Sequence, residues 1–308
     1  MQNCEIENIQ ILLGVNDKPI WSASMNGQPI IIKKYVSNSL LKKTVSEKNA
    51  HITKEITNEV CMLKYIEKSI KFPEGIKVPK SLAVYLEQQV DENKIIEAFQ
   101  CIEKLPGQDL FDWMDINLKL EYDEKHQILR KITERVALAI YILHKNNVIH
   151  GDIKLDNTMI DVSPSGEINL GLIDFVFSQL VDINNVTLIN NKKCAREFNI
   201  FSGTVDYISP ELFFGTPYNL FANDVWGFAM TIFTLYTGYF VGRIDKKYNT
   251  VKKQITISRK YCECSFKEKD LPEDIYKLLC LIFVKEEERI SMEEVIKYLG
   301  IDLMDFYE

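Results

Sequence analysis

The chain has 308 residues, of which 46% are apolar and 26% charged, so it is long enough for one large domain or two lobes. Its formal net charge of −7 argues against a general nucleic-acid binder. The seven cysteines are scattered, with Cys262-Glu-Cys264 as the one close pair, and we interpret them as reduced cytosolic thiols rather than a zinc site.

Neither a secretory signal nor a membrane span is visible. The N-terminus, MQNCEIENIQ, is acidic and lacks an apolar run. The most apolar stretch, residues 225–240, is shorter than the ~20 residues of a membrane-spanning helix, and we interpret it as a helix buried within a large domain. We therefore expect no membrane insertion and a cytoplasmic location, in the cell of origin or in a host cell.

The first third of the chain is rich in strands. Segments with the apolar, β-branched pattern of strands are 10–14, 28–35, 78–86 and 95–103. Asn26-Gly27 predicts a tight hairpin turn before the second of them. Between the second and the third, apolar residues three or four apart predict a helix over 46–70.

After the turn signal Leu105-Pro106-Gly107 the pattern becomes mostly helical. Apolar spacing predicts helices over 121–145, 222–238 and 272–284, and Ser291 with Glu294 forms a capping box that opens a last short helix. The chain is thus expected to form a small strand-rich part, a hinge near 103–108 and a larger helical part. A cleft between two such parts is a natural ligand site.

Residues 148–161, VIHGDIKLDNTMID, place several chemically useful side chains on one loop between two apolar segments. Asp152 could orient a hydroxyl, Lys154 could neutralise phosphate charge, and Asn157 could ligate a metal. Asp174 follows the next apolar strand, where it could supply a second metal ligand. Each carboxylate alone would be an ordinary loop residue or a helix cap. Together and in this order along the chain, the four side chains favour phosphoryl transfer.

These residues resemble motifs of the eukaryotic-type Ser/Thr protein kinases, and the resemblance runs from about Gly14 to Arg289. The run from His150 to Asn157 is similar to the family's catalytic loop, and Asp174-Phe175-Val176 is similar to its metal-binding Asp-Phe-Gly. Lys33 matches the strand lysine that holds the nucleotide phosphates. Glu59 matches the helix glutamate that pairs with that lysine.

The loop pattern also occurs in aminoglycoside and choline kinases, but those enzymes resemble protein kinases only up to the second metal ligand. This chain continues with SGTVDYISPEL, which is similar to the segment that lines the peptide site of protein kinases. In the resemblance, Asp224 braces the catalytic loop and Arg289 pairs with Glu211. The protein-kinase interpretation is therefore favoured over a small-molecule kinase.

The resemblance implies an α+β, bilobal protein-kinase-like fold in a single domain over residues 1–308. The N-lobe, a small antiparallel sheet with one helix, would span 1–103, and the hinge 104–107. The larger, mainly helical C-lobe would span 108–308, with an activation segment over 174–211.

The resemblance also implies ATP and Mg²⁺, or Mn²⁺, as cofactors and a protein as the substrate. The catalytic residues would be Asp152, Lys154 and Thr204, and the metal ligands Asn157 and Asp174. The residues around the nucleotide would be Gly14, Ile20, Ile31, Lys33, Glu59, Ile102 as gatekeeper, Glu103, Leu105, Asp109 and Met159.

The sequence departs from the family pattern at four places. The phosphate-covering loop, LGVNDKPIWSA, has only one of the glycines of the family pattern, Gly14. Ile31 replaces a small residue that packs on adenine, and Val176 replaces the glycine after Asp174-Phe175. Gly151 stands where regulated kinases carry an arginine that binds a phosphate on the activation segment.

These departures decide what is expected of activity and control. We expect a Ser/Thr protein kinase that is not controlled by phosphorylation of Thr187 or Ser202, and whose activation segment is held by its own packing or by a protein activator. The alternative is a pseudokinase that binds a nucleotide or a partner as a scaffold.

Overall fold

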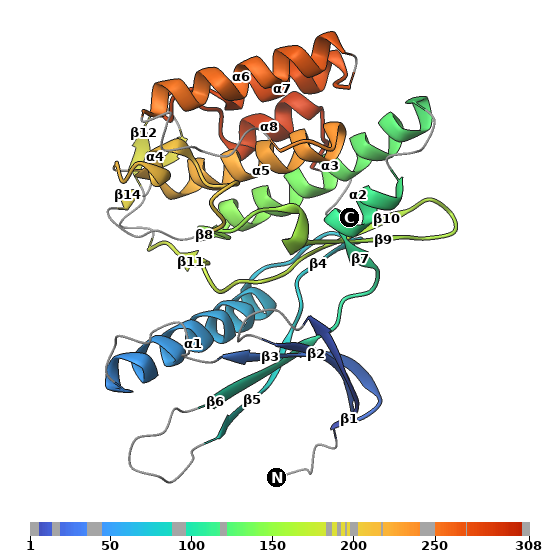
Figure 1. Ribbon diagram of the computed structural model, residues 1–308, viewed down its shortest axis with the longest axis vertical. Coiled ribbons are helices and arrows are strands. Elements are labelled where there is room, and N and C mark those ends of the chain that lie inside the picture. The colour runs from blue at the N-terminus through green and yellow to red at the C-terminus, as the bar shows by residue number, and fades with distance from the viewer. Residues whose placement is uncertain are drawn as a thin grey trace. The chain divides into compact units, whose positions relative to one another are not determined.

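The computed structural model of the protein describes residues 6–13, 19–35, 45–87, 97–117, 122–182, 187–189, 192–194, 196–197, 203–216, 218–240, 250–268 and 270–303 (Figure 1). The chain forms two compact units. The sheet unit comprises residues 1–69 and 78–105, and the helical unit comprises residues 70–77 and 106–308. Gly14 and Ser202 lie outside the described residues.

The sheet unit is built on an antiparallel sheet with the strand order β1-β2-β3-β6-β5. Its strands are β1 (Ile6–Leu13), β2 (Ile20–Met25), β3 (Gln28–Tyr35), β5 (Ser81–Glu87) and β6 (Glu97–Glu103). Asn26 and Gly27, with φ of 51° and 78°, form the predicted turn between β2 and β3.

The two faces of this sheet have different partners. Ala23, Ile30, Ile32 and Cys101 form a small apolar core on one face. On the other face lies helix α1 (Val45–Ser69), which runs beside β3 in Figure 1. The alternation of strand side chains therefore turns Lys33 toward α1 and its neighbours Ile32 and Lys34 away from it.

The helical unit contains the remaining helices and the short strands. Its helices are α2 (Leu110–Asn117), α3 (Tyr122–Lys145), α4 (Pro210–Phe213), α5 (Leu220–Thr237), α6 (Val251–Lys267), α7 (Glu273–Ile282) and α8 (Met292–Leu299). Helix α5 is buried from Leu220 to Tyr236, as predicted for the most apolar stretch, and ends at Gly238. No helix within the described ranges is long and apolar enough to cross a membrane.

A small sheet of order β4-β10-β9-β7 lies in the same unit, and its strand β9 follows the loop that holds Asp152. Its strands are β4 (Ile76–Lys77), β7 (Gln108–Asp109), β9 (Thr158–Val162) and β10 (Ile168–Leu172). Three further strand pairs join β8 (Val148–Ile149) to β11 (Gln179–Leu180), β12 (Thr187–Ile189) to β13 (Lys192–Cys194), and β14 (Arg196–Glu197) to β15 (Tyr218–Asn219).

The α+β architecture expected from the sequence is confirmed, with an antiparallel sheet followed by a mainly helical region. Each predicted strand and helix is present, with ends that differ by a few residues. The capping box is also confirmed, because Ser291 Oγ accepts a hydrogen bond from the Glu294 amide while Glu294 accepts one from the Ser291 amide. Helices α2, α4 and α6 were not predicted.

Candidate active site

The loop between β8 and β9 is fixed by one buried carboxylate from helix α5. Asp224 is 1% exposed, and its oxygens accept hydrogen bonds from the amides of His150 at 2.8 Å and Gly151 at 2.9 Å. His144, at the end of α3, lies 3.0 Å from the same carboxylate. The predicted contact between Asp224 and the loop backbone is therefore confirmed.

The His150 ring is fully buried, and its hydrogen bonds select one neutral tautomer. Its Nδ1 accepts a hydrogen bond from the Asp152 amide at 3.3 Å, so its Nε2 carries the proton and donates to the Ile173 carbonyl at 3.1 Å. The Phe175 ring packs against it, with the ring centroids 4.7 Å apart. Burial lowers the pKa of His150, and nearby carboxylates offset this only in part.

Asp152 is the centre of the site, and it is only 5% exposed. Its Oδ1 accepts the Thr204 amide at 2.8 Å, and its Oδ2 accepts Asn157 Nδ2 at 2.9 Å. The Lys154 ammonium lies 3.1 Å from Oδ2 and donates to Thr204 Oγ1 at 2.8 Å. The four predicted residues Asp152, Lys154, Asn157 and Thr204 thus form one hydrogen-bonded cluster.

This cluster can orient an acceptor and balance charge. A carboxylate accepts hydrogen bonds only, so Asp152 is suited to align a hydroxyl that carries a proton. Lys154 supplies a fixed positive charge beside it, where an anionic group would be transferred.

Gly151 is explained by space as well as by backbone conformation. Its φ is +83°, and a Cβ added to it would lie 2.6 Å from the Phe177 carbonyl oxygen. Any other residue would push apart the loop and the segment after Phe175. This close backbone contact leaves no room at position 151 for the arginine of the family pattern.

The two predicted metal ligands are brought together by the backbone. The Ile173 amide donates to the Asn157 carbonyl at 3.0 Å, which fixes Asp174 one residue beyond this bond. Asp174 has a φ of +67°. Because Asn157 Nδ2 bonds Asp152, its Oδ1 is the atom left for a cation.

This donor set fits Mg²⁺. No group of three or more His, Cys, Asp or Glu side chains that could hold a metal occurs among the described residues. Mg²⁺ needs no such cage, because it is usually held by one or two protein oxygens, with waters and substrate phosphates completing its octahedron.

In the sheet unit the predicted ion pair is formed. Lys33 Nζ lies 2.7 Å from Glu59 Oε1, with side-chain exposures of 15% and 1%. Ile20 on β2 and Gln100 on β6 lie directly opposite Lys33. Ile31, two residues before Lys33, is opposite Ile102. Ile20, Ile31, Lys33 and Ile102 therefore share the face of the sheet on which Glu59 lies.

Two of the residues predicted to bind the nucleotide, Glu103 and Leu105, lie near the end of the sheet unit. The Glu103 amide donates to the Lys80 carbonyl at 2.9 Å, so Glu103 has only its carbonyl oxygen for an adenine. Leu105 is buried. The turn after it depends on Gly107, whose φ is +84° and whose added Cβ would lie 2.0 Å from the Ile160 carbonyl oxygen.

Asp109 and Met159, predicted near the nucleotide, face each other across β7 and β9 in the helical unit. Asp109 Oδ1 accepts the Asp112 amide at 2.8 Å, so this carboxylate also caps α2. Partial burial raises the pKa of Asp109, and the bond from the Asp112 amide opposes this effect.

The predicted pair of Glu211 and Arg289 is confirmed. Arg289 Nη2 lies 3.1 Å from both carboxylate oxygens of Glu211, and the Arg289 side chain is fully buried. Its other nitrogens donate to the carbonyls of Ile282 and Ala222, and the guanidinium lies over the Trp226 ring. The pair fixes the end of the SGTVDYISPEL segment to the core.

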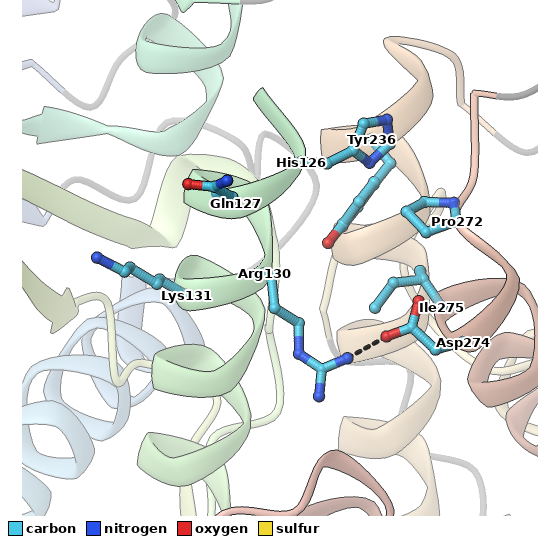
Figure 2. Close-up of a pocket in the computed structure, with 8 residues that line it drawn as sticks. All are labelled: His126, Gln127, Arg130, Lys131, Tyr236, Pro272, Asp274 and Ile275. Carbon is cyan, nitrogen blue, oxygen red and sulfur yellow. Dashed lines mark hydrogen bonds and ion pairs between the residues drawn. The ribbon is translucent and has the colours of Figure 1, made fainter. Parts of the chain in front are cut away.

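A pocket of about 570 Å³ lies elsewhere in the helical unit, among α3, α5 and the start of α7 (Figure 2). Its size would suit a small molecule. Arg130, however, is already bonded to Asp274, Glu134 and the Leu299 carbonyl. The arginine of this pocket serves to join helices, and none of the predicted site residues lines it.

Comparison with known proteins finds similarity to protein kinases. A family model described as "Protein kinase domain" matches residues 30–299. The "Probable serine/threonine-protein kinase KIN1 homolog" of Enterocytozoon bieneusi is 26% identical over 252 residues, which cover 78% of this chain and 38% of that protein. "Probable serine/threonine-protein kinase 2" of Plasmodium falciparum is 26% identical over 264 residues, covering 85% of this chain and 43% of that protein.

A mammalian relative is similar to the same degree. "NUAK family SNF1-like kinase 1" of Mus musculus is 24% identical over 251 residues, which cover 80% of this chain and 33% of that protein. The chain spans less than half the length of each of these three relatives.

Proposed function

The chain belongs to the protein kinase domain family, and from this membership we propose that it is a Ser/Thr protein kinase that transfers the γ-phosphate of ATP to protein hydroxyls. The observation that carries the proposal is the cluster around Asp152. Both oxygens of this buried carboxylate are held, and Lys154 is bonded to both Asp152 and Thr204. Such preorganised charge is what phosphoryl transfer requires of a protein.

In the proposed reaction each residue has one task. Asp152 accepts a hydrogen bond from the acceptor hydroxyl and aligns its oxygen with the phosphate. Lys154 stabilises the negative charge on the group being transferred. Lys33, oriented by Glu59, binds nucleotide phosphates. Asn157 and Asp174 would hold Mg²⁺, which when bound neutralises phosphate charge.

The preference for Ser and Thr is proposed from the bond between Lys154 and Thr204. Lys154 occupies a position where tyrosine kinases lack a lysine, and Thr204 holds it at 2.8 Å. The alternative of a small-molecule acceptor has less support, because the family match extends well beyond the second metal ligand, to residue 299.

We further propose that activity does not depend on phosphorylation of the segment from 174 to 211. Gly151 offers no side chain to bind a phosphate. The segment instead contains strands β11 to β14, of which β12 pairs with β13, while β11 and β14 pair with β8 and β15 outside the segment. Backbone pairing of this kind supports an arrangement that needs no added charge.

The rival function is a pseudokinase that binds a partner without turnover. It is favoured by the departures from the family pattern, first among them the loss of glycines in the loop after Leu13. Against it stands the cluster around Asp152, since a single preorganised charge typically contributes ~10²–10³ in rate and an inactive protein would have little need of the full set.

Turnover separates the two functions. The assay measures transfer of labelled γ-phosphate from ATP·Mg²⁺ to a mixture of acidic and basic proteins, for the wild type and Asp152→Asn. Asp156→Asn is the matched control, because Asp156 is an exposed residue of the same loop. Labelling by the wild type and the control, but not by Asp152→Asn, supports the kinase. Silence of all three at millimolar ATP supports the pseudokinase.

A further inference from the structure

The Glu59 carboxylate has a different partner on each oxygen. Oε1 is bound by Lys33, and Oε2 accepts a short hydrogen bond from the Tyr35 hydroxyl. Glu59 is 0% exposed and Tyr35 4% exposed. A buried carboxylate is stable only when its oxygens are paired and hydrogen-bonded, so the lysine and the tyrosine together compensate its burial.

The strand explains why two residues can hold one carboxylate. Lys33 and Tyr35 are two positions apart on β3, so they project from the same face, toward α1. Lys34 projects from the opposite face, where its ammonium lies over the Phe99 ring. Two adjacent positions on one face fix the rotation of α1 about its axis as well as its distance from the strand.

Tyr35 is itself held by Gln100, which is 0% exposed and lies opposite Lys33 on β6. The Tyr35 hydroxyl oxygen is 2.8 Å from Gln100 Oε1, and Gln100 Nε2 is 3.4 Å from Ser81 Oγ. Tyr35 has one proton, and the carboxylate can only accept it. The opposite orientation of the Gln100 amide satisfies every group, because its NH₂ then donates to Tyr35 and its carbonyl oxygen accepts from Ser81.

We propose that Tyr35 is a positioning residue that keeps Glu59 paired with Lys33 without an activating partner, an inference that rests on the proposed function of this pair. If α1 rotated away, Glu59 would lose two partners rather than one, and the buried Tyr35 hydroxyl would lose the acceptor of its proton. The network of Ser81, Gln100, Tyr35 and Glu59 thus fixes the arrangement in which Lys33 is oriented.

Tyr35→Phe tests this, since it removes one oxygen atom and keeps the ring. We expect amide hydrogen exchange in residues 56–66 of α1 to become roughly tenfold faster, because a buried hydrogen bond that holds the helix is lost. We expect kcat to fall roughly tenfold, with the KM for a peptide substrate unchanged. Tyr141→Phe is the control, because Tyr141 is a buried tyrosine of the helical unit whose hydroxyl accepts a bond from Lys145.

A double-mutant cycle separates positioning from simple packing. In a Glu59→Gln background, Tyr35→Phe should cause no further loss of kcat, because Tyr35 acts through the Glu59 charge. Additive losses, or wild-type exchange in residues 56–66 of Tyr35→Phe, would overturn the inference. If the wild type transfers no phosphate, the proposed function fails, while the exchange of α1 still decides the role of Tyr35.

Discussion

Adding one methyl group at Gly151 should slow the reaction about 10²-fold without unfolding the protein. Gly151 has a φ of +83°, and an alanine there would place its Cβ 2.6 Å from the Phe177 carbonyl oxygen. Ordinary contact begins at 3.4 Å, so the two backbones must separate by 3.4 − 2.6 = 0.8 Å. Because Asp152 is the next residue, it moves with the loop. A misplacement of ~1 Å costs about 10² in rate.

Gly166 provides a control with the same backbone and no clash. It lies in the turn between β9 and β10, its φ is +80°, and a Cβ there meets nothing within 4 Å. Both alanine variants pay the ~1–2 kcal/mol of a left-handed residue, so this cost is common to the pair.

Steady-state kcat and the melting temperature are measured for both glycine variants. We expect Gly166→Ala to keep kcat within about twofold of wild type and Gly151→Ala to lose about 10². Equal kcat values for the two variants would refute the argument that close contact with Phe177 positions the loop. Gly151→Arg, which restores the family residue, should fail for the same reason.

Three further outcomes are expected. Arg289→Met leaves the buried Glu211 charge unpaired, so urea unfolding should show a loss of about 3–5 kcal/mol, and a loss below ~1 kcal/mol would contradict the role of this pair. Because burial lowers the pKa of His150 below its usual 6.5, protonation favours the unfolded chain, and the melting temperature should fall as pH drops below about 6.5. That slope should be shallower in His150→Gln, and an equal slope would count against the buried neutral ring. Lys154→Met should lower kcat about 10²–10³-fold with little change in melting temperature. Thr204→Ser keeps the hydroxyl, so its kcat should remain near that of the wild type. Equal kcat losses in these two variants would contradict the roles of Lys154 and Thr204.

The sequence was sufficient for elements whose buried side is apolar. Helix α5 is so uniformly apolar that its burial could be predicted directly. Helix α6 was missed because its buried stripe includes Gln254, Ser258 and Ser265, which give no apolar period. The short helix α2 was missed as well, since it spans only residues Leu110–Asn117.

The site could be predicted where a motif specified it and not where partners came from distant strands. The contacts of Asp152 with Lys154 and Asn157 lie within one loop, so the order of residues indicated them. Tyr35 gave no signal, because its importance depends on Glu59 and Gln100, which adjoin it only in the folded sheet. At Gly151 the sequence revealed a missing arginine, but the close contact with Phe177 is made only in the folded chain, between residues 26 positions apart.

We propose above that the cluster around Asp152 transfers phosphate to Ser and Thr hydroxyls. The most direct test of this proposal is to identify, by mass spectrometry, the phosphorylated residues of a mixed Ser, Thr and Tyr peptide library incubated with ATP·Mg²⁺ and either wild type or Asp152→Asn. The account predicts phosphoserine and phosphothreonine with the wild type, and a yield lower by ~10³ with the variant. Phosphotyrosine as the main product, or equal yields from the two proteins, would contradict it.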